Sequence, residues 1–312
     1  MDTGVPQGSV LGPLLFSLFV NNLPAQLQGV TTVLFADDTS LCIAGRSTDD
    51  ISNTLTRALG SAHKWLLDSG LKLNVGKTKC MLISSNRRKS LLALNVQLDG
   101  VCIEQVCTYK FLGVMVNQSL SWSNHIDLVS SRASKGLNLL RRIAWFLPKN
   151  VLCCFYKGYI LPQLTYADTV WGSCTRAESD RLERLQNYAA RIILGRRRDA
   201  SATAMRCELG WPTLASRRAL AELQMVYRCV TGCAPQYLAS LFVRNTDIHL
   251  HNTRAAASGG IHVPKVRSEF GKKSFAFRGC QRWNALTPFM RTIKNPTTFM
   301  TTARSNLLTY TT

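Results

Sequence analysis

The chain has 312 residues, of which 46% are hydrophobic, and its formal net charge is +20. This apolar content is enough for one large or two ordinary globular domains and excludes an intrinsically disordered chain. No apolar run approaches the length of a transmembrane helix and no lipidation motif is present, so we expect no membrane attachment. Eleven cysteines without a recognisable signal peptide indicate reduced thiols in an intracellular protein of the nucleus, the cytoplasm or both.

The first predicted helix follows a loop rich in glycine and proline. Residues 4–13 contain three glycines and two prolines. A backbone without Cβ atoms can approach a ligand closely, so this loop suits the sugar and base of a nucleotide, although a loop that only needs positive φ angles has the same composition. From Leu14 onward the apolar residues recur at helical spacing, which predicts a buried helix over residues 12–24.

Residues 33–43 contain the most informative pattern, two apolar runs joined by Asp37 and Asp38. Apolar runs of β-branched and aromatic residues on both sides of a short polar break predict a β-hairpin over residues 31–44. Aspartate is common in turns, so the two carboxylates could serve the turn alone. Two carboxylates on a rigid turn can also bind a hard divalent cation through their oxygen atoms.

A long helix and several strands are predicted after the hairpin. Apolar residues at helical spacing predict a helix over residues 50–69, followed by a strand over residues 78–85. Lys77 and Lys79 lie two positions apart and therefore on one face, where a lysine can neutralise a triphosphate or protonate a leaving pyrophosphate. A pair of solvated lysines is the alternative. Further strands are expected across residues 94–116.

The second half of the chain is predicted to be helical and is strongly basic. Residues 1–130 carry 10 basic and 9 acidic residues, whereas residues 131–312 carry 28 and 9. Apolar stripes predict helices over residues 122–145, 176–194 and 213–230. Cations off the first stripe and directly after the second helix can follow a nucleic-acid backbone or form an ordinary solvated face. These cations are Arg132, Lys135, Arg141, Arg142, Arg196, Arg197 and Arg198.

The composition of the chain changes at residue 244 and again at residue 267. Residues 244–266 have the composition of a loop or linker, and residues 267–312 interleave aromatic and basic side chains. Such a mixture can stack the bases of a single strand or pack a small helical domain, and we favour packing for most of these aromatics.

Four segments, in this order and at these spacings, resemble the reverse transcriptase domain of non-LTR (LINE-type) retrotransposons. Gly4–Phe16 resembles motif B, Phe35-Ala36-Asp37-Asp38 resembles motif C, Leu71–Met81 resembles motif D, and Phe111-Leu112-Gly113 resembles the motif E primer grip. The resemblance continues into the thumb and the region after it, at Trp122-Ser-x-His125-Ile126, Tyr166-Ala-x-x-x-Trp171-Gly172 and Trp283-Asn284.

The resemblance implies roles for particular residues. Asp37 would hold the catalytic metal ions, Mg²⁺ or Mn²⁺, with support from Asp38, and Lys77 would act as the motif D acid. It also implies an RNA template, a DNA primer and dNTPs as partners. The nucleotide and template pocket would be formed by Pro6, Gln7, Gly8, Ser9, Phe35 and Ala36, and the primer grip by Phe111, Leu112 and Gly113. Cys229, Cys233, His249 and His251 are too widely spaced for the zinc knuckle of related elements, so structural cysteines are favoured.

Two parts of such a polymerase have no counterpart in this sequence. The motif A Asp lies upstream of motif B in the family, and here motif B begins at residue 4; the fingers are missing as well. Two-metal phosphoryl transfer needs carboxylates around both cations, so we expect weak metal binding and a nucleic-acid-binding fragment that is inactive alone. An active polymerase completed by another chain, and a non-catalytic nucleic-acid-binding module, are the alternatives.

The predicted fold class is α+β, with a partial polymerase palm followed by an all-helical thumb and C-terminal region. The palm, an antiparallel sheet on helices, is assigned to residues 1–120, and the basic helical thumb or connection region to residues 121–243. A loop or linker over residues 244–266 and a basic-aromatic segment over residues 267–312 complete the chain. The sequence leaves the oligomeric state open.

Overall fold

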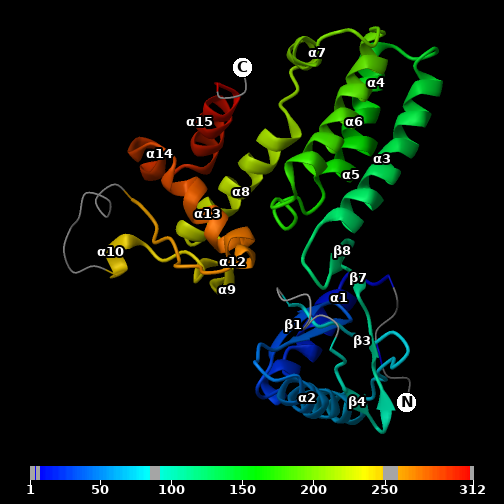
Figure 1. Cartoon of the computed structure of the whole chain (residues 1–312), viewed down its shortest axis with the longest axis vertical. Helices are drawn as coiled ribbons and strands as arrows, with labels where there is room; N and C mark the ends of the chain where they lie inside the picture. Colours follow the sequence, from blue (N-terminus) through cyan, green and yellow to red (C-terminus); the bar gives the residue numbers. More distant parts are fainter. Residues whose placement is uncertain (1–3, 5–7, 85–91, 249–258, 310–312) are drawn as a thin grey trace. The chain divides into compact units, whose positions relative to one another are not determined.

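A computed structural model describes residues 4, 8–84, 92–248 and 259–309 (Figure 1). Short strands occupy the first part of the chain and helices the remainder, so the predicted α+β class is confirmed. The chain divides into two compact units. The first unit comprises residues 1–109 and 117–119, and the second, called here the helical unit, comprises residues 110–116 and 120–312. Within the described ranges, no helix is long and apolar enough to span a bilayer.

The first unit is built around one long amphipathic helix, α2. The Ser47 side chain accepts a hydrogen bond from the backbone N–H of Asp50 and so caps its start, and Gly70, with φ of +73°, follows its end. The helix predicted over residues 50–69 is confirmed. The elements of this unit are α1 (Gly12–Val20), η1 (Leu23–Gln26), β1 (Thr31–Phe35), β2 (Asp38–Cys42), α2 (Thr48–Asp68), β3 (Lys79–Cys80), β4 (Gln97–Leu98), β5 (Val101–Cys102) and β6 (Glu104–Gln105).

The strands of the described chain form separate two-stranded sheets, where the sequence suggested one palm sheet. β1 pairs with β2 and β4 with β5 in antiparallel fashion, whereas β3 pairs with β6 in parallel. The predicted strand over residues 78–85 was too long, because among residues 78–84, the part of this range that the structure describes, only Lys79 and Cys80 pair with another strand. A small cluster of apolar residues packs the β4–β5 pair against α2; its buried members are Leu59, Leu94, Val96, Leu98 and Ile103.

The expectation that α1 is a buried helix was wrong. Leu14 and Leu18, two residues of its predicted inner face, are 57% and 63% exposed, and Val20 is its one buried large side chain. The helix is apolar around most of its circumference, so periodicity could not tell which face is covered. Because an exposed apolar surface favours association, we expect the isolated chain to be poorly soluble or to self-associate.

The helical unit is centred on α3 (Ser123–Ile143) and α6 (Arg176–Leu194), which pack on each other. The predicted stripe on α3 is confirmed, since Ile126, Ala133 and Leu140 have no exposed surface. A capping box between Thr175 and Glu178 starts α6, and Gly195, with φ of +61°, ends it as predicted. The neighbouring elements are β7 (Thr108–Phe111), β8 (Val114–Asn117), α4 (Lys149–Phe155), η3 (Tyr156–Ile160, a π-helical turn), α5 (Leu161–Thr165), α7 (Ala202–Leu209) and α8 (Leu214–Val230).

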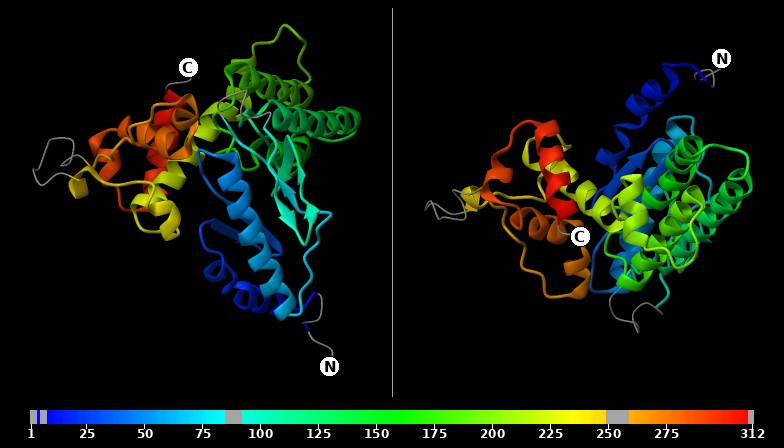
Figure 2. Two further views of the ribbon diagram at one scale, coloured as in Figure 1. Left: turned by 60° about the horizontal axis from the view of Figure 1, so that its bottom comes forward. Right: turned by 90° about the horizontal axis from the view of Figure 1, so that it is seen from above.

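The C-terminal helices pack on the C-terminal half of α8 and form a second core (Figures 1 and 2). Trp283 and Phe299 are fully buried there with their rings 5.8 Å apart, as the packing alternative predicted, whereas Phe289 is 71% exposed. Residues 249–258, including the candidate ligands His249 and His251, lie outside the described residues. The elements are α9 (Gln236–Ala239), α10 (Asn245–Ile248), α12 (Glu269–Lys273), α13 (Phe275–Asn284), α14 (Pro288–Thr292) and α15 (Pro296–Thr309).

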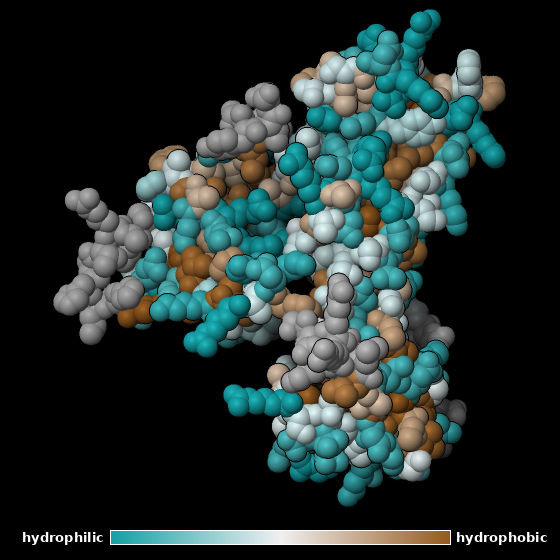
Figure 3. All heavy atoms as spheres, in the orientation of Figure 1, coloured by the Kyte–Doolittle hydropathy of each residue, from teal (hydrophilic) through white to brown (hydrophobic). Residues whose placement is uncertain are grey.

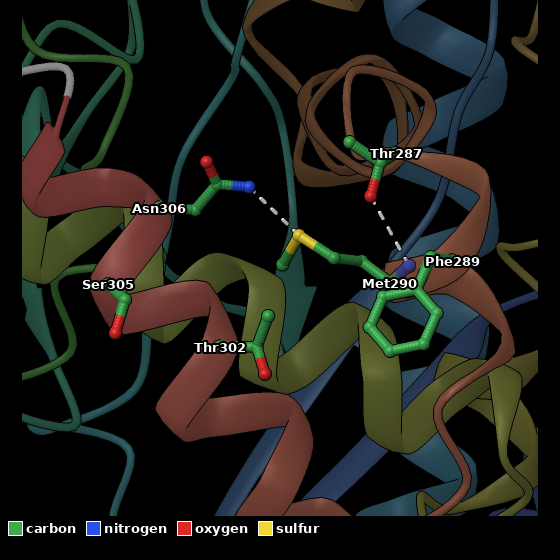
Figure 4. Close-up of a pocket in the computed structure, with 6 residues that line it drawn as sticks. All are labelled: Thr287, Phe289, Met290, Thr302, Ser305 and Asn306. Carbon is green, nitrogen blue, oxygen red and sulfur yellow. Dashed lines mark hydrogen bonds between the residues drawn. The ribbon is translucent and has the colours of Figure 1, made fainter.

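A hollow of about 330 Å³ lies between α14 and α15 (Figure 4). The Asn306 amide donates a hydrogen bond to Met290 Sδ at 3.0 Å, and the Met290 backbone N–H donates to Thr287 Oγ1 at 3.4 Å. No charged side chain lines the hollow, and we assign it no function.

The predicted segment boundaries at residues 120, 243 and 266 stay predictions.

Candidate metal and nucleic-acid sites

The Asp37-Asp38 pair lies at the turn of the predicted hairpin, which is confirmed. Phe35 pairs with Asp38 across β1 and β2, so Ala36 and Asp37 form a two-residue turn. Ala36 has φ of +50°, a left-handed conformation that is uncommon for a residue with a Cβ atom and that clusters at functional sites. Both carboxylates are exposed, and no cation of the described chain forms an ion pair with either.

The turn offers the ligands that a magnesium ion uses. Mg²⁺ prefers carboxylate oxygens, and in polymerase-type sites it is held by one or two carboxylates together with substrate phosphates and water. Asp37 and Asp38 supply two such groups. The described residues contain no cluster of three or more His, Cys, Asp or Glu side chains that could hold a metal. The pair therefore fits a shared site, in which substrate oxygens complete the coordination, and does not fit a closed all-protein cage.

The two lysines of the motif D segment differ in their environment. Lys79 Nζ forms an ion pair with Glu104 Oε2 at 2.5 Å, next to the β3–β6 pairing. Lys77 is exposed and only its backbone N–H is bonded, to Asn74 Oδ1 at 3.0 Å. An ammonium group held by a carboxylate is a poor proton donor to substrate, so Lys77 is the better candidate of the two. No hydrogen bond or ion pair links Lys77 to the Asp37-Asp38 turn within the described part of the unit.

The residues assigned to the nucleotide and template pocket are only partly described. Pro6 and Gln7 lie outside the described residues. Gly8 has φ of +87°, and the Ser9 hydroxyl accepts a hydrogen bond from the backbone N–H of Gly12 at 3.1 Å, at the entry to α1. Phe35 is 61% exposed on the hairpin, which leaves its ring free to meet a ligand.

The predicted primer grip is the turn between β7 and β8. Leu112 and Gly113 have φ of +45° and +85°, the combination that a tight two-residue hairpin turn requires. The Tyr166 hydroxyl donates a hydrogen bond to the Leu112 carbonyl at 2.8 Å. A Cβ atom on Gly113 would lie 3.1 Å from the Tyr166 ring, so glycine allows this ring to approach the turn closely. All of these residues belong to the helical unit.

A histidine holds the other side of the same turn. The Met115 backbone N–H donates to His125 Nδ1 at 3.2 Å, and the imidazole lies 5.6 Å from the Trp171 ring. Burial, and then the positive charge of Arg132, lower the pKa of His125, which favours the neutral ring that accepts this bond. The turn is therefore fastened to α3 by His125 and to the segment after α5 by Tyr166.

Tyr166→Phe should loosen the primer-grip turn without unfolding the helical unit. The exposed hydroxyl makes one hydrogen bond, whose loss costs about 1 kcal/mol, and the ring remains in place beside Gly113. We expect faster hydrogen exchange at the amides of residues 112–115, measured by mass spectrometry, with exchange in α6 unchanged. Tyr159→Phe, a change at another exposed tyrosine of the unit, is the control. Equal exchange in both variants would show that the bond does not hold the turn.

The thumb motif around Trp171 has a structural explanation that its spacing did not reveal. Trp171 is fully buried, and its indole N–H donates to the Tyr166 carbonyl at 2.9 Å. A Cβ atom on Gly172 would lie 2.9 Å from Glu222 Oε1 and still closer to Arg278, so glycine leaves room for a buried ion pair. Sequence reasoning missed this Glu222 cluster, because its members come from distant segments.

The predicted backbone-binding cations of α3 are all exposed. Arg132, Lys135, Arg141 and Arg142 lie away from the buried stripe, as expected for a helix whose other face packs in a core. Arg196, Arg197 and Arg198, after the end of α6, are also exposed. Positive side chains on a surface attract phosphates through Coulomb forces that salt screens.

Two exposed aromatics beside these cations were not among the predicted site residues. Trp145 and Phe146 follow α3 directly and are 87% and 85% exposed. The sequence did contain a signal for them: two large aromatics stand where the apolar stripe of α3 ends, shortly after two arginines.

The chain is similar to known polymerases of mobile elements. Residues 1–116 match the family model described as reverse transcriptase (RNA-dependent DNA polymerase). A Pol polyprotein of the type-1 retrotransposable element R1 2 from Nasonia vitripennis is 28% identical over 67% of this chain and 53% of its own length. The RNA-directed DNA polymerase from the mobile element jockey of Drosophila melanogaster is 28% identical over 62% of this chain and 22% of its own length. The probable RNA-directed DNA polymerase from transposon BS of the same organism has the same identity and coverage.

The chain thus spans between about a fifth and about half of the length of these relatives. No solved structure matches it. The matching segment contains the Asp37-Asp38 hairpin, and the similarity to the relatives extends well beyond it. Residues 1–116 are thus similar to reverse transcriptases, and a longer part of the chain is similar to polymerases of retrotransposable and mobile elements.

Proposed function

We propose that this chain is a fragment of an RNA-directed DNA polymerase that binds an RNA template, a DNA primer and dNTPs. The observation that carries the proposal is the Asp37-Asp38 turn, two exposed carboxylates on a strained hairpin inside the segment that matches the reverse transcriptase family. The strongly basic second half of the chain supports it, because a polyanion is the partner that such charge attracts.

Each proposed site residue has a separate role in the reaction. When Mg²⁺ or Mn²⁺ is bound, it supplies Lewis-acid stabilisation of the phosphates and of the attacking 3′-hydroxyl. Asp37 would hold the metal with support from Asp38, and Lys77 would supply a positive charge or a proton to the pyrophosphate. Phe35 and Ala36 border the nucleotide, and the Phe111–Gly113 turn holds the primer end. The exposed arginines of α3 follow the nucleic-acid backbone.

We further propose that the 312-residue chain alone extends a primer slowly or not at all. Two-metal transfer needs several carboxylates around both ions, and the turn provides two, with no third acid close by in the described part of the chain. Metal affinity should therefore be weak. The free state of all eleven cysteines supports the accompanying proposal that the protein works in a reducing, intracellular compartment.

The test combines primer extension with metal and template binding. The purified chain is given an RNA template and a DNA primer with Mg²⁺ or Mn²⁺, alongside an Asp37→Asn/Asp38→Asn variant. The matched control is Asp49→Asn/Asp50→Asn, since these are also adjacent and exposed carboxylates of the same unit. Mn²⁺ binding is read from its electron paramagnetic resonance signal, and template–primer affinity from fluorescence anisotropy across a range of salt.

We expect salt-sensitive template–primer binding, weak Mn²⁺ binding that only the Asp37/Asp38 variant loses, and no measurable extension. Extension that disappears in the Asp37/Asp38 variant would show a complete site and overturn the inactivity proposal. Mn²⁺ binding that is equal in all three proteins would favour a non-catalytic nucleic-acid-binding module. Absence of template binding at any salt concentration would overturn the proposal as a whole.

A further inference from the structure

One end of the helical unit gathers exposed aromatic and basic side chains that the sequence places far apart. The loop between α3 and α4 presents Trp145 and Phe146, which are 87% and 85% exposed. Exposing two large aromatic rings to water is unfavourable, and neither ring has a role in the cores of the unit. We call residues 141–149 together with residues 196–198 the tip.

An ion-pair bridge joins the two parts of the tip. Glu208, on α7, accepts a hydrogen bond from Lys149 Nζ at 3.0 Å through one carboxylate oxygen and from Arg196 Nη2 at 3.3 Å through the other. This bridge brings the arginine run after α6 beside the first residue of α4, directly after the aromatic loop. The ends of α3 and α6 accordingly lie at the same end of the helical unit in Figure 1, and hydrophilic side chains gather there in Figure 3.

Trp145 also borders an open hollow of about 470 Å³. The other side chains that line the hollow are Asn138, Arg141 and Arg142, all from the last turns of α3. The hollow thus combines an aromatic face, an amide that can donate and accept hydrogen bonds, and two guanidinium groups. A nucleobase with its phosphate needs this combination of groups: a ring to stack on, a polar partner for the base edge, and donors for the phosphate oxygens.

We infer that the tip binds single-stranded nucleic acid by stacking bases on Trp145 and Phe146 while its arginines contact the phosphates. The inference rests on the nucleic-acid binding proposed above and deepens it, because it adds base stacking and a preference for unpaired strands. In a duplex the base faces are covered by their neighbours, so only a single strand gains from the two rings. An interfacial membrane helix would need a continuous apolar face, and the apolar stripe of α3 is buried in the core.

Aromatic substitutions at the tip test the inference on the full chain. A labelled, unstructured RNA oligonucleotide and the same sequence in duplex form serve as probes in fluorescence anisotropy. Trp145→Ala and Phe146→Ala should each weaken single-strand binding about tenfold and leave duplex binding within about twofold. Trp145→Phe keeps a stacking face and should bind nearly as wild type. Phe289→Ala, at an aromatic of the same unit that is 71% exposed, is the control and should bind as wild type.

Tryptophan fluorescence provides an independent readout. Trp122, Trp171, Trp211 and Trp283 are buried and Trp65 is half-buried, so Trp145 is the most exposed of the six tryptophans. The part of the quenching by single-stranded RNA that arises at Trp145 should be lost in Trp145→Phe. Equal loss of single-strand and duplex affinity in the alanine variants, or no loss, would overturn the inference while the proposed function stands. A blue shift of Trp145 emission with anionic phospholipid vesicles, without quenching by RNA, would overturn it in favour of a membrane contact. If no protein in the series binds either probe, the proposed function has failed with it.

Discussion

Glu222→Gln should lower the free energy of unfolding of the helical unit by about 3–5 kcal/mol, because it removes a buried carboxylate that pairs with two arginines. Glu222 is 1% exposed on α8 and forms ion pairs with Arg278 and Arg282 of α13. Its Oε2 accepts from Arg282 Nε at 2.8 Å, and Arg278 is largely buried and donates to the Thr169 carbonyl at 3.0 Å. Without the carboxylate, Arg278 keeps its desolvation cost and loses its counter-charge, whereas Arg282, with 38% of its side chain exposed, is hydrated by water.

Chemical denaturation followed by circular dichroism measures this loss, and Glu208→Gln is the matched control. Glu208 also bridges two cations, Lys149 and Arg196, but it is exposed, so water replaces the lost interactions and stability should hardly change. A second variant in which Glu222, Arg278 and Arg282 are replaced together by methionine should recover much of the stability, since no charge is then left unpaired. Equal stability of Glu222→Gln and Glu208→Gln would show that the cluster is not a stabilising element.

The stability of the helical unit should fall by about 3 kcal/mol as pH rises from 4 to above 6, through the titration of Asp168 alone. Burial, opposed by Arg218 and reinforced by Glu222, raises the pKa of Asp168 from 3.8 to about 6. The folded state therefore holds this proton more tightly than the unfolded state. The resulting stabilisation is fully present below pH 3.8 and is lost as pH rises through about 6.

The contribution of Asp168 is isolated by comparing variants at two pH values. Asp168→Asn removes the titration, so relative to wild type it should be stabilising at pH 7.5 and nearly neutral at pH 4, as measured by denaturant unfolding. Asp180→Asn, at an exposed aspartate on α6, should show the same difference from wild type at both pH values. An Asp168→Asn effect that does not change with pH would contradict the assigned titration.

The parts of the protein that depend on near neighbours in the chain could be predicted without the structure. The Asp37-Asp38 turn follows from two β-type runs around a polar break, and α6 follows from an apolar stripe that ends at Gly195. Each relies on interactions between residues a few positions apart, which the sequence displays directly. The contact of Gly113 with the Tyr166 ring joins residues far apart in the chain, and local patterns do not show it.

Other features depend on contacts between distant segments, and for these the sequence allowed several outcomes. The periodicity of α1 marks a wide apolar face but not what covers it, and the face proved to be exposed. Short strands such as β3 form only where a partner of matching register arrives, which local composition does not encode.

The buried Glu222 cluster and the tip also depend on contacts between distant segments. Glu222, Gly172 and Arg278 meet only because α8 and α13 pack together, and Lys149 meets Arg196 only through Glu208. Local patterns thus specified the individual elements, their ends and the chemistry of the Asp37-Asp38 turn. The pairing of charges between distant segments, including the one that brings Arg196 beside Lys149, came from packing, because burial and electrostatic energies depend on distances in space and not on separation along the chain.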